Sequence, residues 1–276
     1  MTLAKIKQVQ ALTIAGFDSG GGAGLQADLK TFQECKVFGT SVLTALPIQN
    51  TRGVKKVYDI PLAAIQDQLE VVAEDFKISA YKMGMLFTTE IIQLIAAFIQ
   101  GQDFGYLVVD PVMIAKSGQK LLLDSAITSL IKDILPLATV ITPNLPEAEV
   151  ILQRKIEGSI EMEQAAYELQ RLGAKNVVIK GGHSQDFEVS ADVLLLDDGT
   201  IHWFSSPRID TENTHGTGCT FSACITAELA KGASVKEAVE IAKAFIEAAL
   251  SYPIDVGHGH GPTNHWAYNE RNGLDG

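Results

Sequence analysis

The segment NTHGTGCT, residues 213–220, runs directly into residues 221–231, where small residues predominate in a pattern typical of a helix. Glycines and hydroxyl residues before a helix leave backbone N–H groups unpaired at the positive end of the helix dipole. Such a helix start is a natural site for a phosphate group, and it favours the thiolate form of a cysteine. Because Cys219 lies at this point, the segment predicts phosphoryl transfer with the thiol as a nucleophile or a base.

The rest of the chain predicts one large domain. Its 276 residues contain no Pro/Gly/Ser-rich linker, no low-complexity tract and no internal repeat, so we expect a single domain over residues 1–276. Lysine and arginine number 22 against 33 acidic residues, which gives a net charge of -11. This charge disfavours nucleic acid and anionic membranes as partners, so an anionic ligand has to be held by local features.

Cysteine usage and hydropathy indicate the compartment. Cys35, Cys219 and Cys224 are too few and too scattered for a disulfide framework or a zinc site, so reduced thiols are expected. The longest apolar run, residues 91–99, is too short to span a bilayer, and residues 1–10 lack the apolar core of a signal peptide. We therefore expect a soluble cytoplasmic protein that binds a small molecule and neither nucleic acid nor a membrane.

Apolar, β-branched runs alternate with amphipathic stretches, which predicts an α/β fold with a mostly parallel sheet and helices on both faces. A turn at residues 197–200 joins two apolar runs and predicts an antiparallel edge. The expected strands are 9–15, 41–46, 80–83, 106–110, 139–142, 177–180 and 191–196. The expected helices are 22–35, 61–76, 88–100, 125–135, 144–152, 160–172, 217–231 and 234–250. In such sheets ligands bind at the carboxyl ends of the strands.

Two polar segments near the N-terminus have both a structural and a functional interpretation. Residues 15–24 are rich in glycine but lack the Gly-Lys-Ser/Thr of a Walker loop, so a tight turn competes with a ligand loop in which Asp18 orients a small substrate. Residues 47–53 are expected to form a loop after the second strand. A solvated turn explains that loop, whereas the amide of Gln49 also suits a heteroaromatic amine and its ring nitrogen.

Further candidates follow the central strands. The methionines of residues 82–86 fit either the core or a pocket for a flat aromatic ligand. Asp110 ends a strand, and Asn144 with Glu147 has the spacing of a helix capping box, but these acids equally suit Mg²⁺ bound through water. Lys180 either faces solvent at the end of its strand or supplies a positive charge to a nucleotide phosphate.

Two other features have plain structural interpretations. The histidine- and glycine-rich residues 256–265 contain no cysteine and have one carboxylate nearby, which favours an ordered closing loop over a metal site. Cys224, five residues after Cys219 in the same predicted helix, is expected to be an inert core residue.

Together these segments resemble the ribokinase-like superfamily and, within it, the bacterial hydroxymethylpyrimidine and hydroxymethylpyrimidine phosphate kinases of thiamin synthesis. The resemblance covers about residues 10–265 and is carried by residues 15–31, 49–53, 142–148, 180–182 and 214–220. It implies a three-layer α/β/α fold, a homodimer, and the use of ATP and Mg²⁺. The implied reaction phosphorylates 4-amino-5-hydroxymethyl-2-methylpyrimidine to its monophosphate and then to the diphosphate.

The resemblance also implies roles for individual residues. Substrate contacts would come from Gln49, Asp18, Gly16, Ala23, Met85 and Val112. Nucleotide and phosphate contacts would come from Lys180, Asn144, Glu147, Thr211, Thr217, Gly216 and Gly218. Water-mediated Mg²⁺ ligands would be Glu147, Asn144 and Asp110. Gly216 and Gly218 would form the anion hole, and Cys219 would accept the proton where the superfamily's sugar kinases place an aspartate base.

Three alternatives remain at this level. A pyridoxal kinase of the same subfamily shares the cysteine motif, but the Gln49 amide pairs better with an aminopyrimidine, although some members use both substrates. A non-catalytic ligand sensor is disfavoured by the intact set of Asn144, Glu147, Lys180 and Cys219. An ATP-dependent repair dehydratase on this fold would be expected to lack the Gln49 loop.

Overall fold

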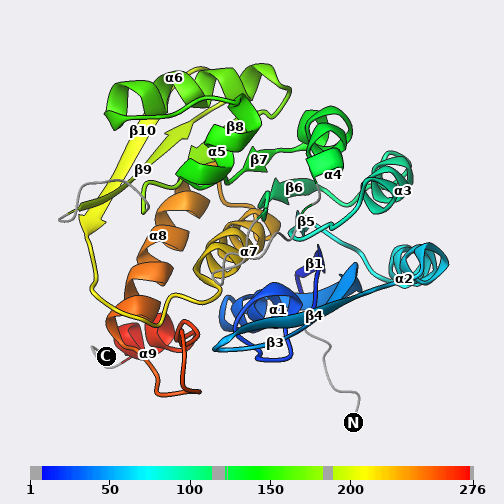
Figure 1. Cartoon of the computed structure of the whole chain (residues 1–276), viewed down its shortest axis with the longest axis horizontal. Helices are drawn as coiled ribbons and strands as arrows, with labels where there is room; N and C mark the ends of the chain where they lie inside the picture. The colour runs from blue at the N-terminus through cyan, green and yellow to red at the C-terminus, as the bar shows by residue number, and fades with distance from the viewer. Residues whose placement is uncertain (1–7, 114–121, 123, 183–188, 274–276) are drawn as a thin grey trace, which may run out of the picture.

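The computed structural model describes residues 8–113, 122, 124–182 and 189–273. Within these residues the central sheet has eight strands in the order β10-β9-β8-β7-β6-β5-β1-β2 (Figure 1). The strands are β1 (Gln10–Ala15), β2 (Phe38–Leu43), β5 (Ala80–Met83), β6 (Tyr106–Val109), β7 (Val140–Ile141), β8 (Asn176–Ile179), β9 (Val189–Leu195) and β10 (Ile201–Pro207). Strands β2, β1, β5, β6, β7 and β8 are parallel, and β9 pairs antiparallel with both β8 and β10. The expected mostly parallel sheet with an antiparallel edge is confirmed.

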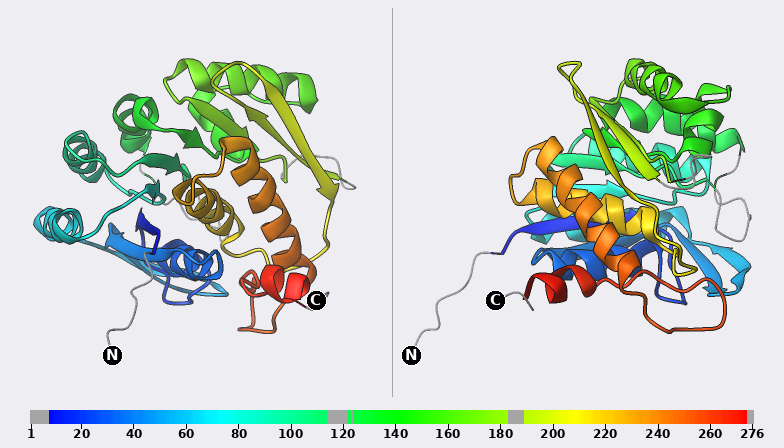
Figure 2. Two further views of the ribbon diagram at one scale, coloured as in Figure 1. Left: turned by 180° about the vertical axis from the view of Figure 1, so that it is seen from behind. Right: turned by 90° about the vertical axis from the view of Figure 1, so that its left-hand side faces the viewer.

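Helices cover both faces of this sheet (Figure 2). One face carries α2 (Leu62–Asp75), α3 (Thr89–Ile99), α4 (Asp124–Ser129), α5 (Leu145–Leu152) and α6 (Gly158–Arg171). The other carries α1 (Gly24–Glu34), α7 (Thr217–Ala230), α8 (Val235–Ser251) and the short α9 (Ala267–Gly273). Successive strand residues point to opposite faces, so Leu12 and Ile14 of β1 pack in the first core and Ala11 in the second.

Helix α7 lies deep in the second layer because its side chains are small. Residues 220–229 are all buried, and six of these ten are alanine, serine, threonine or cysteine. Small residues allow the helix to approach β1, β5 and β6 closely, and all three strands contact it. The packing along α7 therefore fixes where its N-terminus lies at the carboxyl ends of those strands.

The expectation of one strand over residues 41–46 followed by a loop was wrong. The second sheet strand ends at Leu43, and the chain then forms an antiparallel pair, β3 (Ala45–Asn50) with β4 (Gly53–Asp59), outside the main sheet. Thr44 makes the crossing, because its N–H donates to the carbonyl of Ala15 at 3.0 Å and its hydroxyl to that of Met85 at 2.6 Å. Its polar groups are thus satisfied without a place in either strand.

Two further differences concern helices. The helix expected at 125–135 begins at Asp124, changes to a π-helical turn at Leu130–Ile134 and ends in a 3₁₀ turn at Leu135–Leu137, which contains Pro136. Helix α9 follows the histidine- and glycine-rich segment and was not predicted. Among the described helices, none combines the length and the apolar character that crossing a membrane requires.

Candidate active site

The N-terminus of α7 is an open cluster of backbone N–H groups. Its N-cap, Gly216, has φ 82° and no side chain, so no side-chain cap covers the first turn. A Cβ at Gly216 would clash with the carbonyl of Gly22, and a Cβ at Gly218 would lie 3.2 Å from Nζ of Lys180. The two predicted anion-hole glycines therefore admit close neighbours on both sides and leave the helix start free for an anion.

The turn after β1 is organised by one buried carboxylate. Asp18 accepts hydrogen bonds from the backbone N–H groups of Gly20, Gly22 and Ala23 at 2.7–2.9 Å, and Nε2 of His215 lies 2.8 Å from its Oδ2. Burial opposes ionisation, but His215 and the backbone donors keep the pKa of Asp18 below its usual value. The carboxylate thus ties this turn to the segment before α7. Its oxygens are engaged inside the protein rather than turned outward to orient a substrate.

A second group of charges lies at the ends of β6 and β8. Nζ of Lys180 is 3.0 Å from Asp110, whose carboxylate also accepts from Ser222 of α7 at 3.3 Å and from Thr142 at 3.4 Å. Burial opposes the charge on Lys180, but Asp110 and Glu147 outweigh it and raise the pKa of the lysine. Lys180 is therefore a fixed cation beside Gly218 rather than a solvent-facing strand exit.

Asn144 and Glu147 form a complete capping box at the start of α5. The side chain of each accepts a hydrogen bond from the backbone N–H of the other at 2.9 Å. Burial raises the pKa of Glu147 to about 7, with Lys180 opposing and Asp110 adding to the shift. The capping interpretation is thus confirmed as a structural role.

These residues also fit a divalent cation. Two buried carboxylates, Asp110 and Glu147, disfavour each other's charge, and a cation between them would relieve this. Both already accept hydrogen bonds within the protein, which leaves few free oxygens for direct ligation. That arrangement suits Mg²⁺, which keeps several water ligands and needs only one or two carboxylates.

The thiol of Cys219 is held in its protonated form, contrary to the pKa expected for a cysteine at a helix start. Burial raises its pKa to about 11, although Lys82 and the backbone N–H of Gly24 act in the opposite direction. Asp28 and Asp110 add to the rise. The helix start therefore does not suffice to make a thiolate in the unliganded protein.

Lys82 and Asp28 were not among the predicted site residues. Lys82 is fully buried in β5, and its Nζ lies 2.6 Å from Oδ1 of Asp28 on α1. The signal was present in the sequence, because a lysine in the middle of a strand that is buried on both faces needs a charged partner. Its partner stands 54 residues earlier in a different element, which the pattern could not reveal.

The ring-binding side of the predicted site is formed around the first turn and the hairpin. A Cβ at Gly16 would lie 3.0 Å from Sδ of Met85, so these two predicted residues adjoin. Val112 lies beside Asp110, and its backbone N–H donates to the backbone carbonyl of Asp110 at 2.8 Å. A β-bulge between Ile48 and Gln49 changes the direction of the strand at Gln49, which is the kind of irregularity that redirects a side chain at a site.

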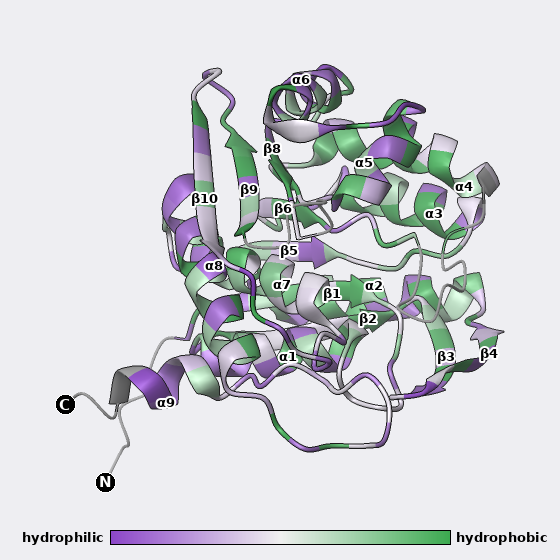
Figure 3. Ribbon diagram, turned by 60° about the vertical axis from the view of Figure 1, so that its left-hand side comes forward, coloured by the Kyte–Doolittle hydropathy of each residue, from purple (hydrophilic) through white to green (hydrophobic). Residues whose placement is uncertain are grey.

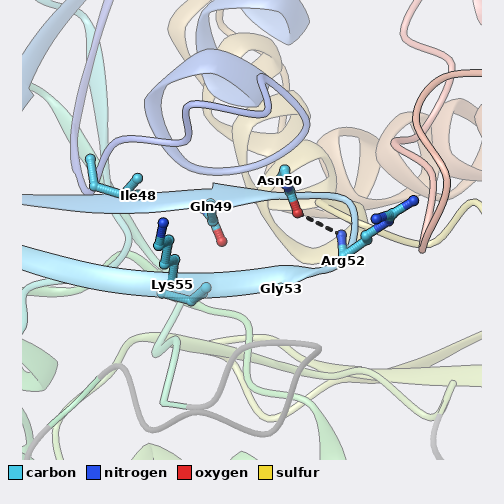
Figure 4. Close-up of a pocket in the computed structure, with 7 residues that line it drawn as sticks. Ile48, Gln49, Asn50, Arg52, Gly53 and Lys55 are labelled. Atoms are coloured by element: carbon cyan, nitrogen blue, oxygen red, sulfur yellow. Dashed lines mark hydrogen bonds between the residues drawn. The ribbon is translucent and has the colours of Figure 1, made fainter.

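A shallow pocket of about 280 Å³, largely open to solvent, lies at the hairpin tip. Figure 4 shows Gln49, Asn50 and Arg52 around it, with Lys55 of β4 on the opposite strand. Gln49 is fixed through its backbone, which exchanges two hydrogen bonds with the hydroxyl of Ser19 at 2.6 and 2.9 Å. The hairpin is thereby joined to the turn that Asp18 organises.

The histidine- and glycine-rich segment packs against the same tip. Oγ1 of Thr51 accepts from the backbone N–H groups of His258 at 3.1 Å and Gly259 at 3.2 Å. Gly257 has φ 79° and lies against the Thr51 side chain, and a Cβ at Gly259 would clash with the Thr51 carbonyl. Close approach explains these glycines. Within the described part of the chain, the potential metal ligands that cluster are Cys35, Cys224 and Glu228, so these histidines form no such group.

Two predicted nucleotide residues make only local contacts in the structure. The hydroxyl of Thr211 accepts from the backbone N–H of Asn213 at 3.1 Å, and that of Thr217 donates to the carbonyl of Thr214 at 2.8 Å. Both belong to the segment that leads into α7. Their side chains shape that segment, and the structure does not join Thr211 to the Lys180 group.

The fold and the site define the class of protein, a kinase of small molecules. The ADP complex of Bacillus subtilis pyridoxal kinase superposes with a TM-score of 0.87 and 42% identity, over 96% of this chain and 100% of that one. Staphylococcus aureus pyridoxal kinase with AMP-PCP superposes with a TM-score of 0.88 and 38% identity, over 96% of each chain. These likenesses confirm the ribokinase-like three-layer fold.

Sequence similarity narrows the class to a family. Residues 18–264 match the family described as phosphomethylpyrimidine kinase. A hydroxymethylpyrimidine/phosphomethylpyrimidine kinase of Haemophilus influenzae is 57% identical over 268 residues, which are 96% of this chain and 99% of that protein. The chain belongs to the phosphomethylpyrimidine kinase family.

Proposed function

We propose that this protein uses ATP to phosphorylate 4-amino-5-hydroxymethyl-2-methylpyrimidine to its monophosphate and then to the diphosphate, in thiamin biosynthesis. The observation that carries the proposal is the open start of α7, where Gly218 adjoins Lys180 and Gly216 adjoins the 16–23 turn. Phosphate-binding N–H groups thus lie between a fixed cation on one side and the Gly16, Met85 and Gln49 region on the other. Kinase activity in the close relatives supports the same assignment.

The chemistry follows from this arrangement. Phosphoryl transfer has a loose transition state, so positioning and charge stabilisation do most of the work. The N–H groups of Gly218 and Cys219 donate to the oxygens of the moving group, and Lys180 offsets its charge. The substrate oxygen forms the new bond to phosphorus while ADP departs with the electrons of the broken bond, and the hydroxyl proton passes to the sulfur of Cys219, which has first lost its own proton to water and is then a thiolate.

Nucleotide and cation are assigned to the Lys180 side. Complexes of the related pyridoxal kinases with ADP and AMP-PCP support ATP as the phosphoryl donor. Asp110 and Glu147 would hold Mg²⁺ through water, next to the Asn144 cap, and the bound cation would offset the charge of the nucleotide phosphates. Thr211 and Thr217 are assigned to shaping the loop at the phosphates.

The pyrimidine is assigned to the hairpin side. The amide of Gln49 offers a donor and an acceptor to the ring amine and nitrogen, and Met85 with Val112 provides an apolar surface for a flat ring. Gly16 and Ala23 allow close approach of the backbone, while Asp18 positions their turn. We further assign the protein to the cytoplasm as a homodimer of single-domain chains, and light scattering of the purified protein tests that oligomeric state.

A side-by-side turnover assay tests the substrate. The pyrimidine, its monophosphate and pyridoxal are each supplied with ATP, with and without Mg²⁺, and product is measured directly. We expect the pyrimidine and its monophosphate to be used with higher kcat/KM than pyridoxal, and only with Mg²⁺. A strong preference for pyridoxal would replace the proposal with the alternative of a pyridoxal kinase, and turnover that persists in a chelator would remove the Mg²⁺ assignment.

A further inference from the structure

An ion pair lies in the centre of the molecule, beneath the active site. Lys82 and Asp28 are both 0% exposed, and Nζ lies 2.6 Å from Oδ1. The other carboxylate oxygen accepts from the hydroxyl of Thr13 at 2.6 Å. Thr13 of β1 and Lys82 of β5 are neighbours in the register of the sheet, so the two side chains leave the same face side by side. In Figure 3 part of β5 is coloured as hydrophilic although the strand is buried.

That face is the one covered by α1 and α7. Helix α7 packs over β1, β5 and β6, and α1 contributes Asp28, which pairs with Lys82 of β5. A Cβ at Gly84 would lie 3.5 Å from Nζ of Lys82, which places the ammonium toward the carboxyl end of β5. The first turn of α7 with Cys219 lies at the same end, and the ammonium and the thiol are close enough to influence each other's ionisation.

The charges around the thiol come from four elements. Lys82 of β5 favours the thiolate, whereas Asp28 of α1 and Asp110 at the end of β6 disfavour it. Lys180 at the end of β8 interacts with the thiol as a further cation, and the N–H of Gly24 donates to the sulfur. Lys180 lies beside Gly218 in the first turn of α7, at the positive end of the helix dipole. A cation is unfavourable there unless an anion is also present.

We propose that the buried Lys82–Asp28 pair controls the charge of Cys219, with the ammonium of Lys82 stabilising the thiolate and Asp28 limiting that effect by holding the ammonium. This inference deepens the proposed role of Cys219 as proton acceptor and rests on it. Lys82 is a positioning residue, since it acts through the thiol and needs no contact with substrate. A buried ion pair contributes little net stability compared with apolar residues of the same shape, so stability alone does not account for it.

Two proton transfers take place at Cys219, and Lys82 gives up no proton in either. Before transfer, the thiol of Cys219 loses its proton to water, and Lys82 stabilises the anion that remains. The substrate hydroxyl then gives its proton to the sulfur as its oxygen bonds to phosphorus, which restores the neutral thiol. Lys82 keeps its proton throughout, because Asp28 and the thiolate both favour its charged form.

The test measures the thiol directly, without substrate. The rate of alkylation of Cys219 by iodoacetamide is followed against pH by peptide mass spectrometry in the full chain, with Cys219→Ser as the blank. The variants are Lys82→Met, Asp28→Asn and the double variant, all close in shape to the native side chains. Lys243→Met is the matched control, because Lys243 lies 2.8 Å from Asp192 in another largely buried pair on a different part of the fold.

The two single variants are expected to shift the alkylation pKa in opposite directions. Asp28→Asn frees the ammonium to pair with the sulfur and lowers the pKa, and Lys82→Met removes the cation and raises it, each by about one unit or more. Lys243→Met leaves it unchanged. If Lys82→Met does not fold, the downward shift in Asp28→Asn still decides the matter. Equal alkylation pKa values in Asp28→Asn and the native protein, or shifts in the same direction, overturn the proposal.

A rate profile separates this inference from the proposed function. With whichever acceptor the native enzyme phosphorylates, the rising limb of kcat/KM against pH should move to lower pH in Asp28→Asn. Absence of turnover with the pyrimidine in the native enzyme removes the proposed substrate, while the alkylation result stands on its own. A shifted alkylation pKa with an unshifted rate profile contradicts the role of the pair in catalysis.

Discussion

In the proposed reaction Cys219 serves two successive phosphoryl acceptors, which differ in how much they need a base. The hydroxymethyl group must lose a proton as it attacks, whereas the monophosphate attacks as an anion that is already formed. We expect Cys219→Ala to reduce kcat/KM for the first phosphorylation by 10²-fold or more, within the range that general base catalysis contributes, and the second far less. Separate turnover of the two acceptors measures this.

The control lies on the same helix. Cys224 is fully buried five residues further along α7, with its sulfur 3.8 Å from that of Cys35, and it belongs to the core. Cys224→Ala should leave the ratio of the two steps unchanged. Equal losses of both steps in Cys219→Ala would show that the thiol shapes the site without accepting a proton, and a phosphocysteine intermediate would overturn the mechanism altogether.

Glu147 makes the free energy of unfolding of the protein without bound metal depend on pH. Its pKa rises from 4.5 in the unfolded chain to about 7 in the folded one, so its ionisation costs the native state free energy as pH rises through that window. Glu147→Gln keeps the capping box and removes this cost. We therefore expect the free energy of unfolding of the variant, relative to the native protein in a chelator, to increase between pH 5 and pH 8 by about 3 kcal/mol.

The second capping box provides an opposite control. Glu237 at the start of α8 is exposed, and hydrogen bonds from Ser234 lower its pKa. Its carboxylate therefore stabilises the native state above its unfolded pKa, and this contribution is lost as pH falls. Glu237→Gln should be less stable than the native protein near neutral pH and converge with it in acid. The same pH trend in both variants would contradict the assignment for Glu147.

At the residue level the sequence revealed those positions whose neighbours are close in the chain. The glycines of the α7 start and the Asn144/Glu147 box are local patterns, and the structure places them as expected. The pKa of Cys219 was not predictable, because it depends first on burial and then on Lys82, Asp28 and Asp110, which only the fold brings together. The same holds for His215, whose partner Asp18 stands 197 residues earlier.

The turn between β3 and β4 is joined to the C-terminal loop through the side chain of Thr51. Thr51 supplies the oxygen that accepts two N–H groups of that loop. Thr51→Val keeps the shape and removes the acceptor, so we expect faster hydrogen exchange in residues 257–261 and a higher KM for the pyrimidine, with kcat less affected. Exchange mass spectrometry and initial rates measure these changes.

A turn at the other end of the sheet provides the comparison. Thr200 lies in the exposed β9–β10 turn, and its hydroxyl interacts with Asp198. Thr200→Val should change neither KM nor the exchange of residues 257–261. If Thr51→Val also changes neither KM nor the exchange of residues 257–261, the hairpin tip and the loop are not coupled.

Elements with a strong periodicity of apolar residues were predictable, whereas the β3–β4 hairpin was not. The central strands and most helices follow from alternating or helical apolar patterns, within a few residues at their ends. Residues 41–46 were predicted as one strand, and nothing local marks Thr44 as the point where the chain leaves the sheet. That crossing depends on carbonyls of Ala15 and Met85, which belong to two other strands.

The whole molecule has two cores that share one sheet. Alternate residues of the same strands enter each core, so neither core persists when the sheet is lost. We expect one unfolding transition in urea. Fluorescence of Trp203, which packs against the first core, and the thiol reactivity of Cys35 and Cys224 in the second should give the same midpoint in a Trp266→Phe, Cys219→Ser background. Two separate midpoints would indicate two domains.

Helix α7 is buried along almost its whole length, so one end of the candidate site is fixed, whereas the other end can adjust. The turn that we propose binds phosphate cannot shift without disturbing the core in which that helix is embedded. The other end is a two-stranded ribbon outside the main sheet, joined to the rest by surface hydrogen bonds. With the ring assigned to this ribbon as proposed, we expect substitutions there to alter which ring is accepted while the transfer chemistry stays intact, so that acceptor choice diverges without a new catalytic centre.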